Sequence, residues 1–137
     1  MNLQDKLKDF SHLDQVKFSL FCAKQVAHLS SDPCAKAALS AAEAWVEDPS
    51  EDNRLKCKEA ATDAAAWAAA YTTVDAAAWG TAWAAAYAAW TADWAAAYAD
   101  WAAADATRTA YYTTKANSEL TKEGLFQSWL MSLVIEG

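Results

Sequence analysis

Glycine and proline are scarce in this chain, with 3 glycines and 2 prolines among 137 residues. Turns between β-strands depend on both residues, because glycine accepts positive φ angles and proline fixes φ. A fold with many short strands and hairpins would need more of them. The composition therefore excludes a hairpin-rich β fold and favours long helices.

Cysteine and histidine are also few, with 3 and 2 residues. Cys22, Cys34 and Cys57 have no C-x-x-C spacing, and neither His12 nor His28 stands at ligand spacing from them. Zinc and iron sites need such clusters, so we expect no metal and no cofactor. The first ten residues are polar and charged, so we expect no signal peptide and reduced thiols in the cytoplasm.

Basic residues are outnumbered, with 11 Lys and Arg against 18 Asp and Glu and a net charge of −7. Binding to nucleic acid phosphates needs a basic surface, so direct nucleic-acid binding is not expected. A charge inside a bilayer is costly, and aspartates interrupt the alanine-rich run at short intervals. No membrane span is therefore expected. These aspartates are Asp63, Asp75, Asp93, Asp100 and Asp105.

Common catalytic motifs are absent: the sequence has no G-x-S-x-G, P-loop, H-E-x-x-H or glycine-rich phosphate loop. Asp75, Asp93 and Asp100 share one helix flank, and paired carboxylates are able to do acid–base chemistry. Such residues more often mark the solvent boundary of a helix or accept hydrogen bonds from indole N–H groups. We therefore expect a protein that is not an enzyme and has no catalytic residues.

What the sequence does contain is helical periodicity, as in the apolar spacing of Leu13, Val16 and Leu20. We predict an all-α helical bundle of five to six helices around a long central helix rich in Ala, Trp and Tyr. It forms one domain over 1–137, with a short N-terminal helix in 1–12, the bundle core in 13–116 and a C-terminal amphipathic helix in 117–137. The expected helices cover Leu3–Asp9, Leu13–Leu29, Pro33–Glu47, Glu51–Tyr71, Val74–Ala116 and a last one beginning after Asn117 or Ser118.

The expected helix Val74–Ala116 is unusually long. Unbroken, it would extend about 60 Å at 1.5 Å per residue, whereas a compact domain of this size is only about 35–40 Å across. It therefore either bends, near Gly80 or near Thr107–Thr109, or protrudes and finds a partner.

Residues 60–112 are about half alanine, and 11 of the other 26 residues are Trp or Tyr. The favoured interpretation is that these aromatic residues fill the bundle core while the alanine face lets neighbouring helices approach. Two alternatives stay open: a pocket that stacks a flat ligand such as a nucleobase, and a seam for self-association. At about 100° per residue, one narrow line of the helix, here called the aromatic stripe, holds Trp79, Trp83, Tyr87, Trp90, Trp94, Tyr98 and Trp101.

Polar residues continue the stripe beyond Trp101, and Asp105 and Arg108 stand at a spacing that allows an ion pair. One hypothesis is that these residues form the mouth of a binding site, in which Arg and Lys bind an anionic group of the ligand and the aromatic side chains stack on its ring. The other is that the helix leaves the core there and becomes solvated. The candidate ligand-binding residues are Trp94, Trp101, Asp105, Arg108, Tyr112 and Lys115.

The C-terminal segment carries a second apolar stripe, formed by Phe126, Trp129, Leu130 and Leu133. Both this stripe and the long helix would have to fold back onto one small core in a monomer. Large exposed apolar patches usually mark interaction surfaces. We therefore expect a two-fold homodimer with these four residues at its interface.

Three segments resemble a family of alanine-rich helical proteins described as putative immunity proteins, with relatives in tailed phages. They are FSLFCAKQV at 18–26, ALSAAEAWV with the acidic turn that follows at 38–50, and TAYYTTKA at 109–116. The resemblance covers residues 15–116. It implies an accessory protein of a phage or mobile element that acts in the bacterial cytoplasm by binding and not by catalysis.

Together these observations predict a non-enzymatic binding protein, an inhibitor, immunity-type or counter-defence factor with a protein partner. The alternative is a protein that sequesters a nucleotide-like small molecule in a pocket lined by Trp and Tyr.

Overall fold

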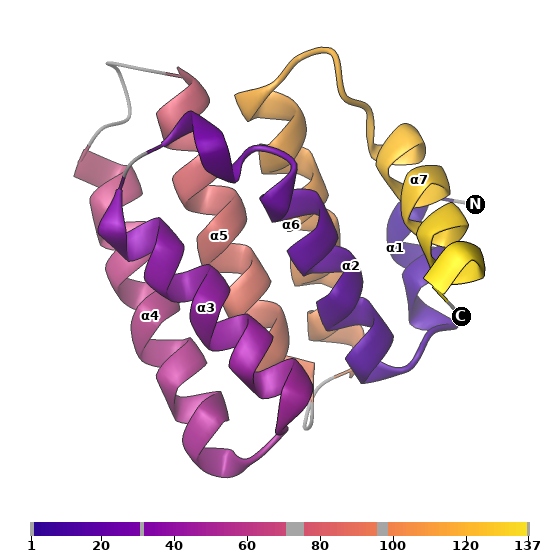
Figure 1. The fold of residues 1–137 in the computed structure, drawn as a ribbon, viewed down its shortest axis with the longest axis horizontal. Helices are drawn as coiled ribbons and strands as arrows, with labels where there is room; N and C mark the ends of the chain where they lie inside the picture. The colour runs from indigo at the N-terminus through magenta and orange to yellow at the C-terminus, as the bar shows by residue number, and fades with distance from the viewer. Residues whose placement is uncertain (1, 31, 71–75, 96–98, 137) are drawn as a thin grey trace.

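The chain is an all-α bundle in the computed structural model, which describes residues 2–30, 32–70, 76–95 and 99–136. No strand occurs in these ranges, as the scarcity of glycine and proline predicts. The α-helices are α1 (Leu3–Lys8), α2 (His12–Lys24), α3 (Pro33–Glu47), α4 (Glu51–Ala70), α5 (Ala76–Ala95), α6 (Ala99–Ala116) and α7 (Lys122–Glu136), with a short 3₁₀ helix at Ala27–Leu29 (Figure 1).

Short polar side chains begin most of these helices. Ser11 accepts a hydrogen bond from the Asp14 N–H at the start of α2. Asp32 caps the N–H groups of Cys34 and Ala35 and is followed by Pro33 at the first position of α3. Such caps satisfy backbone donors that have no partner within the helix. The helix starts at Pro33 and Glu51 were therefore predictable from the sequence.

The long helix expected over Val74–Ala116 is instead two helices, α5 and α6, which lie side by side in opposite directions (Figure 1). The expected bend sites were wrong, because Gly80 and Thr107–Thr109 lie inside regular helices. Helix α5 ends at Ala95 and α6 begins at Ala99. Residues 96–98 lie outside the described residues, as do Thr72 and Thr73, which separate the expected helices Glu51–Tyr71 and Val74–Ala116. Because α5 and α6 are separate helices, the described ranges contain seven α-helices, whereas five to six were expected.

Alanine, and not the aromatic stripe, builds the main core. Helix α5 contacts α2, α3, α4 and α6, and the methyl groups it turns toward them are fully buried. The expectation of a mostly buried stripe was wrong for Trp101, which is 57% exposed. The described members of the stripe on α5 are partly buried at the edge of this core, and Trp83 and Trp90 pack against it. The indole in this core comes from α3, where Trp45 is 5% exposed, and α5 itself contributes methyl groups. The buried alanines of α5 are Ala82, Ala84, Ala85, Ala86, Ala88, Ala89 and Ala92.

Helices α5 and α6 approach each other closely at Gly80. A Cβ atom at this position would lie 2.6 Å from the Ala116 backbone nitrogen and 2.9 Å from the Ala116 Cα. Two hydroxyl contacts also cross between α5 and its neighbours. Ser19 Oγ and Thr91 Oγ1 are 3.1 Å apart, and Thr81 Oγ1 donates to the Val26 carbonyl at 3.1 Å. The core is thus a layer of methyl groups with a few polar contacts within it.

A second core joins α7 to α1, α2 and α6. Trp129 packs edge-on against Phe10 and Phe18, with ring centroids 5.2 and 5.3 Å away. Phe126 and Trp129 are buried here, and Leu130 and Leu133 pack against the same cluster. Two of the four residues expected at a dimer interface are therefore buried inside their own chain. No helix in the described part of the chain is long and apolar enough to cross a membrane.

Candidate binding surface on α5 and α6

A row of partly exposed aromatic side chains follows α5 and the adjacent edge of α6. We call this row the aromatic ridge. It faces away from α2 and α3, because the opposite faces of α5 carry the alanines that pack against those helices. The ridge consists of Trp79, Trp83, Tyr87, Trp90 and Trp94 from α5 with Trp101 and Tyr112 from α6.

Tyr112 joins the α5 part of the ridge into one ring cluster. Its ring stacks on Tyr87 with an interplanar angle of 5° and a centroid distance of 5.5 Å. It also stacks on Trp83 at 5.7 Å and meets Trp79 edge-on at 5.3 Å. Each such pair contributes about 0.5–1.5 kcal/mol beyond the area it buries. The rings therefore hold one another in place although one side of the ridge faces solvent.

The other end of the ridge is a tryptophan pair. The Trp94 and Trp101 rings lie edge to face with centroids 4.9 Å apart. Trp101 is the most exposed aromatic residue among those described, and Tyr98 of the aromatic stripe lies outside the described residues.

An ion pair lies beside the middle of the ridge. Arg108 Nη1 donates to Asp105 Oδ1 at 2.6 Å, as their spacing predicts, and the guanidinium carbon lies 5.9 Å from the centre of the Tyr87 ring. Asp105 is only 5% exposed. Loss of hydration raises the pKa of Asp105 above its ordinary value, although Arg108 acts in the opposite direction. Burial likewise raises the pKa of Tyr87, and the neighbouring Tyr112 raises it further.

A second buried aspartate is held from α4. Arg54 donates to Asp93 on α5 and to both carboxylate oxygens of Glu51. The hydrogen bonds to Glu51, and then the one to Asp93, raise the pKa of Arg54, so it stays charged. Burial, and then the Asp93 charge, raises the pKa of Cys57 to about 12, so this thiol is not a nucleophile. Sequence reasoning missed the Arg54–Asp93 pair, because the two residues are far apart in the chain and share no motif.

The structure brings most of the predicted site residues together, but in a different order. Because α6 returns alongside α5, Arg108 and Tyr112 lie beside Tyr87 and not beyond the end of the stripe. Trp94, Trp101 and Asp105 belong to the same surface. Lys115 lies apart, with its ammonium group 5.1 Å from the centre of the exposed Tyr111 ring.

The aspartates of the expected flank separate as well. Asp93 is buried in its pair with Arg54, Asp100 is exposed, and Asp75 lies outside the described residues. No group of three or more His, Cys, Asp or Glu in the described part of the chain has the arrangement to hold a metal ion. The surface therefore offers stacking faces and ion pairs, which are binding elements.

Comparisons of the chain with protein-family models, with curated proteins and with solved structures found no match.

Replacing Asp105 with asparagine tests the cost of this buried charge. Asparagine keeps an acceptor for Arg108 but is neutral at every pH. The fold raises the pKa of Asp105, so the ionised carboxylate lowers the free energy of unfolding of the wild type near neutral pH. This loss of stability decreases as the pH falls through the raised pKa, because the carboxyl group is then protonated in the folded state. The stability of Asp105→Asn relative to wild type should therefore be highest near neutral pH and fall toward acid pH.

Urea unfolding of both proteins at several pH values measures this difference. Arg108→Gln is the matched control, since it removes the partner but leaves the aspartate. A relative stability of Asp105→Asn that does not change with pH would contradict the expectation.

Proposed function

We propose that this protein is a non-enzymatic binding protein that holds a protein partner on its aromatic ridge. The observation that carries the proposal is the exposure of the ridge: Trp101 is 57% exposed, and the other ridge residues are only partly buried against a core made mainly of alanine. Exposed tryptophans give up burial free energy of roughly 25 cal/mol per Å² of apolar surface. A contiguous apolar surface of this kind usually marks an interaction site.

The composition and rigidity of the ridge support a protein partner. Trp, Tyr and Arg are the residues most enriched where binding energy concentrates in protein interfaces. The rings around Tyr112 are already fixed by stacking on one another. Binding would therefore immobilise few side chains, which lowers the entropic cost of association.

The biological role in this proposal comes from the sequence resemblance. It is an inhibitor, immunity-type or counter-defence factor of a phage or mobile element in the bacterial cytoplasm. The partner would be the protein that such a factor neutralises or protects.

A nucleotide-like small molecule is the second candidate ligand, and the position of Arg108 favours it. Its guanidinium lies over the Tyr87 ring, so a phosphate that met the cation would lie next to the aromatic side chains of the ridge. Two observations weigh against this ligand. Arg108 already forms an ion pair with the Asp105 carboxylate at 2.6 Å. The chain also carries a net charge of −7, which repels an anionic ligand. A phosphate would have to displace that carboxylate.

A photo-crosslinking amino acid at position 101 tests the protein-partner proposal in cells that contain the neighbouring genes. Trp101 is exposed, so the exchange should leave the fold intact. The same amino acid at Leu13, an exposed position on α2, is the matched control. We expect a crosslinked protein at position 101 that excess wild-type protein displaces, and none from position 13.

Identical products from both positions, or none from position 101, would contradict a protein partner on the ridge. Saturable quenching of tryptophan fluorescence by a nucleotide, lost in Arg108→Ala, would favour the small-molecule ligand in its place.

A further inference from the structure

The last two turns of α7 present apolar side chains in nearly every direction. Leu130 and Leu133 face the second core, while Val134 and Ile135 are 76% and 81% exposed. The one polar side chain between them, Ser132, donates to the Trp129 carbonyl of its own helix at 2.6 Å. A helix that is apolar on all sides is normally covered on all sides. The C-terminal end of α7, residues 130–136, is here called the α7 tip. Other parts of the chain therefore cover only one side of it.

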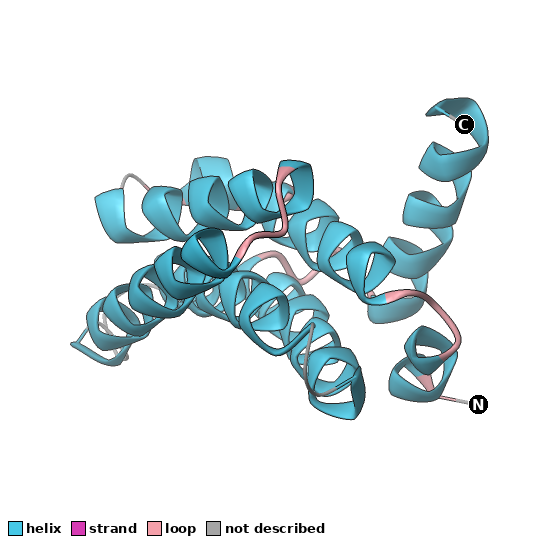
Figure 2. Cartoon of the chain, turned by 90° about the horizontal axis from the view of Figure 1, so that it is seen from below, coloured by secondary structure: helices cyan, strands magenta, loops and turns pink. Residues whose placement is uncertain are grey.

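The α7 tip also stands away from the bundle. Figure 2 shows α7 at one edge of the molecule, with the end marked C rising beyond the layer that holds α2 and α3. The N-terminal half of α7 is fixed by Phe126 and Trp129. The helix thus forms a wall beside the outer face of α2 and α3, and its tip lies above that face.

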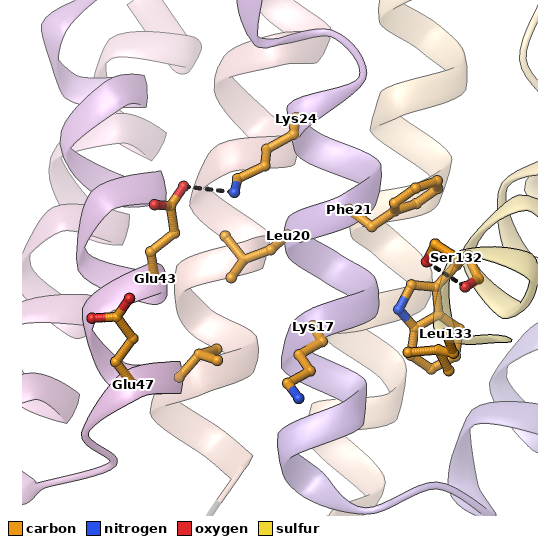
Figure 3. Close-up of a pocket in the computed structure, with 10 residues that line it drawn as sticks. Lys17, Leu20, Phe21, Lys24, Glu43, Glu47, Ser132 and Leu133 are labelled. Carbon is orange, nitrogen blue, oxygen red and sulfur yellow. Dashed lines mark hydrogen bonds and ion pairs between the residues drawn. The ribbon is translucent and has the colours of Figure 1, made fainter. Parts of the chain in front are cut away.

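A groove lies at the foot of this wall, between α2, α3 and α7 (Figure 3). Its volume is about 410 Å³. Leu20, Phe21, Val46 and Leu133 supply apolar lining. Lys24 and Glu43 form an ion pair of 3.0 Å at one end of the groove, and Lys17 and Glu47 lie at the other end. The groove therefore offers an apolar floor between lysines on the α2 side and glutamates on the α3 side.

We propose that the occupant of this groove is the α7 tip of a second copy of the chain, so that two copies clasp each other about a two-fold axis. Each copy has both halves of the contact, a projecting apolar tip and an apolar groove beside it. A two-fold pairing uses the same surface twice and satisfies both halves at once. This interface differs from the one expected at Phe126 and Trp129, which are buried within the chain.

Charge supports the same occupant. The carbonyl end of a helix carries a partial negative charge, and the last turn of α7 has no basic residue to balance it. Within the described residues Lys17 makes no ion pair, and it borders the groove into which the tip would enter. The partner's tip would therefore bring its negative helix end toward this lysine.

Sedimentation equilibrium of the full-length chain, from micromolar to several hundred micromolar, tests the clasp. We expect the mass to rise from 14.8 kDa toward twice that value. Ile135→Asp at the tip and Val46→Asp in the groove should each weaken association at least tenfold. Leu55→Asp, an exposed leucine on α4, is the matched control and should leave association unchanged.

Mixing the two variants gives the sharpest result. A mixed dimer contains one intact tip in one intact groove, whereas each variant alone has none. The mixture of Ile135→Asp and Val46→Asp should therefore associate more strongly than either variant by itself. If Val46→Asp unfolds, Lys17→Glu replaces it, because Lys17 is exposed and its exchange leaves the core untouched.

A mass that stays at 14.8 kDa at every concentration would overturn the proposal. A dimer that tolerates Ile135→Asp, or a mixture that gains nothing over its parts, would also overturn it and point to another face. The aromatic ridge faces away from this groove, so none of these outcomes bears on the proposed partner of the ridge.

Discussion

Replacing Trp129 with alanine should lower the free energy of unfolding by about 3–5 kcal/mol, the range for removing a buried tryptophan. The indole is 2% exposed and touches Phe10, Phe18 and Phe126, which come from three different segments. Its loss would leave a cavity where α1, α2 and α7 meet. Urea unfolding followed by circular dichroism measures the change.

Trp101→Ala is the matched control, since it removes the same side chain from the aromatic ridge. With more than half of the residue exposed, its truncation should cost less than about 1 kcal/mol. A larger loss for Trp101 than for Trp129 would show that the ridge, and not the α7 cluster, carries the stability of the fold.

The second large effect is expected at Gly80. Alanine forms helices better than glycine by about 1 kcal/mol, so propensity alone predicts that Gly80→Ala stabilises α5. The new Cβ would however lie 2.6 Å from the Ala116 nitrogen, which belongs to the backbone of α6 and is not free to turn aside. Overpacking of this kind usually costs about 1–3 kcal/mol. We therefore expect a net loss of stability.

Gly124→Ala separates propensity from packing, because Gly124 also lies in a helix but is exposed. Its new Cβ would meet the Thr121 hydroxyl, a side-chain atom that is able to move. This hydroxyl also accepts from the Gly124 N–H, so moving it weakens one cap. With no backbone in the way, the propensity gain of about 1 kcal/mol should offset that loss, and Gly124→Ala should be at least as stable as the wild type. Equal effects of the two substitutions on thermal unfolding would show that α5 and α6 are farther apart at Gly80.

Local signals predicted the secondary structure well. Asp32 followed by Pro33, and Ser50 before Glu51, are the signs that begin α3 and α4, and the structure confirms both caps. These contacts join residues two or three positions apart, so a single stretch of sequence contains everything they need.

The packing was harder to predict, because periodicity identifies a face but not its surroundings. An aromatic line on an alanine-rich helix is compatible with a core of rings or with a core of methyl groups. The choice depends on how closely the neighbouring helices approach, and the contact of Gly80 with Ala116 shows that they approach very closely. With methyl groups filling the core, the rings had to remain at the surface.

The candidate site was predictable to the same degree. Asp105 and Arg108 are one helical turn apart, so their ion pair follows from the sequence. Two other contacts depend on how α4, α5 and α6 lie side by side. They are the stacking of Tyr112 on Tyr87 and the ion pair between Arg54 and Asp93. Neither contact has a signal in local sequence.

The alanine core has a consequence for the alignment of the helices. Methyl groups form a nearly smooth cylinder, so they resist separation of two helices but hardly resist sliding of one along the other. Larger side chains normally prevent such sliding by interlocking. Here that task falls to directional contacts, namely the hydroxyl pair Ser19–Thr91 and the bond from Thr81 to the Val26 carbonyl. These hydroxyl groups add direction to a core in which the fit of Gly80 against Ala116, and larger side chains such as Trp45, also limit sliding.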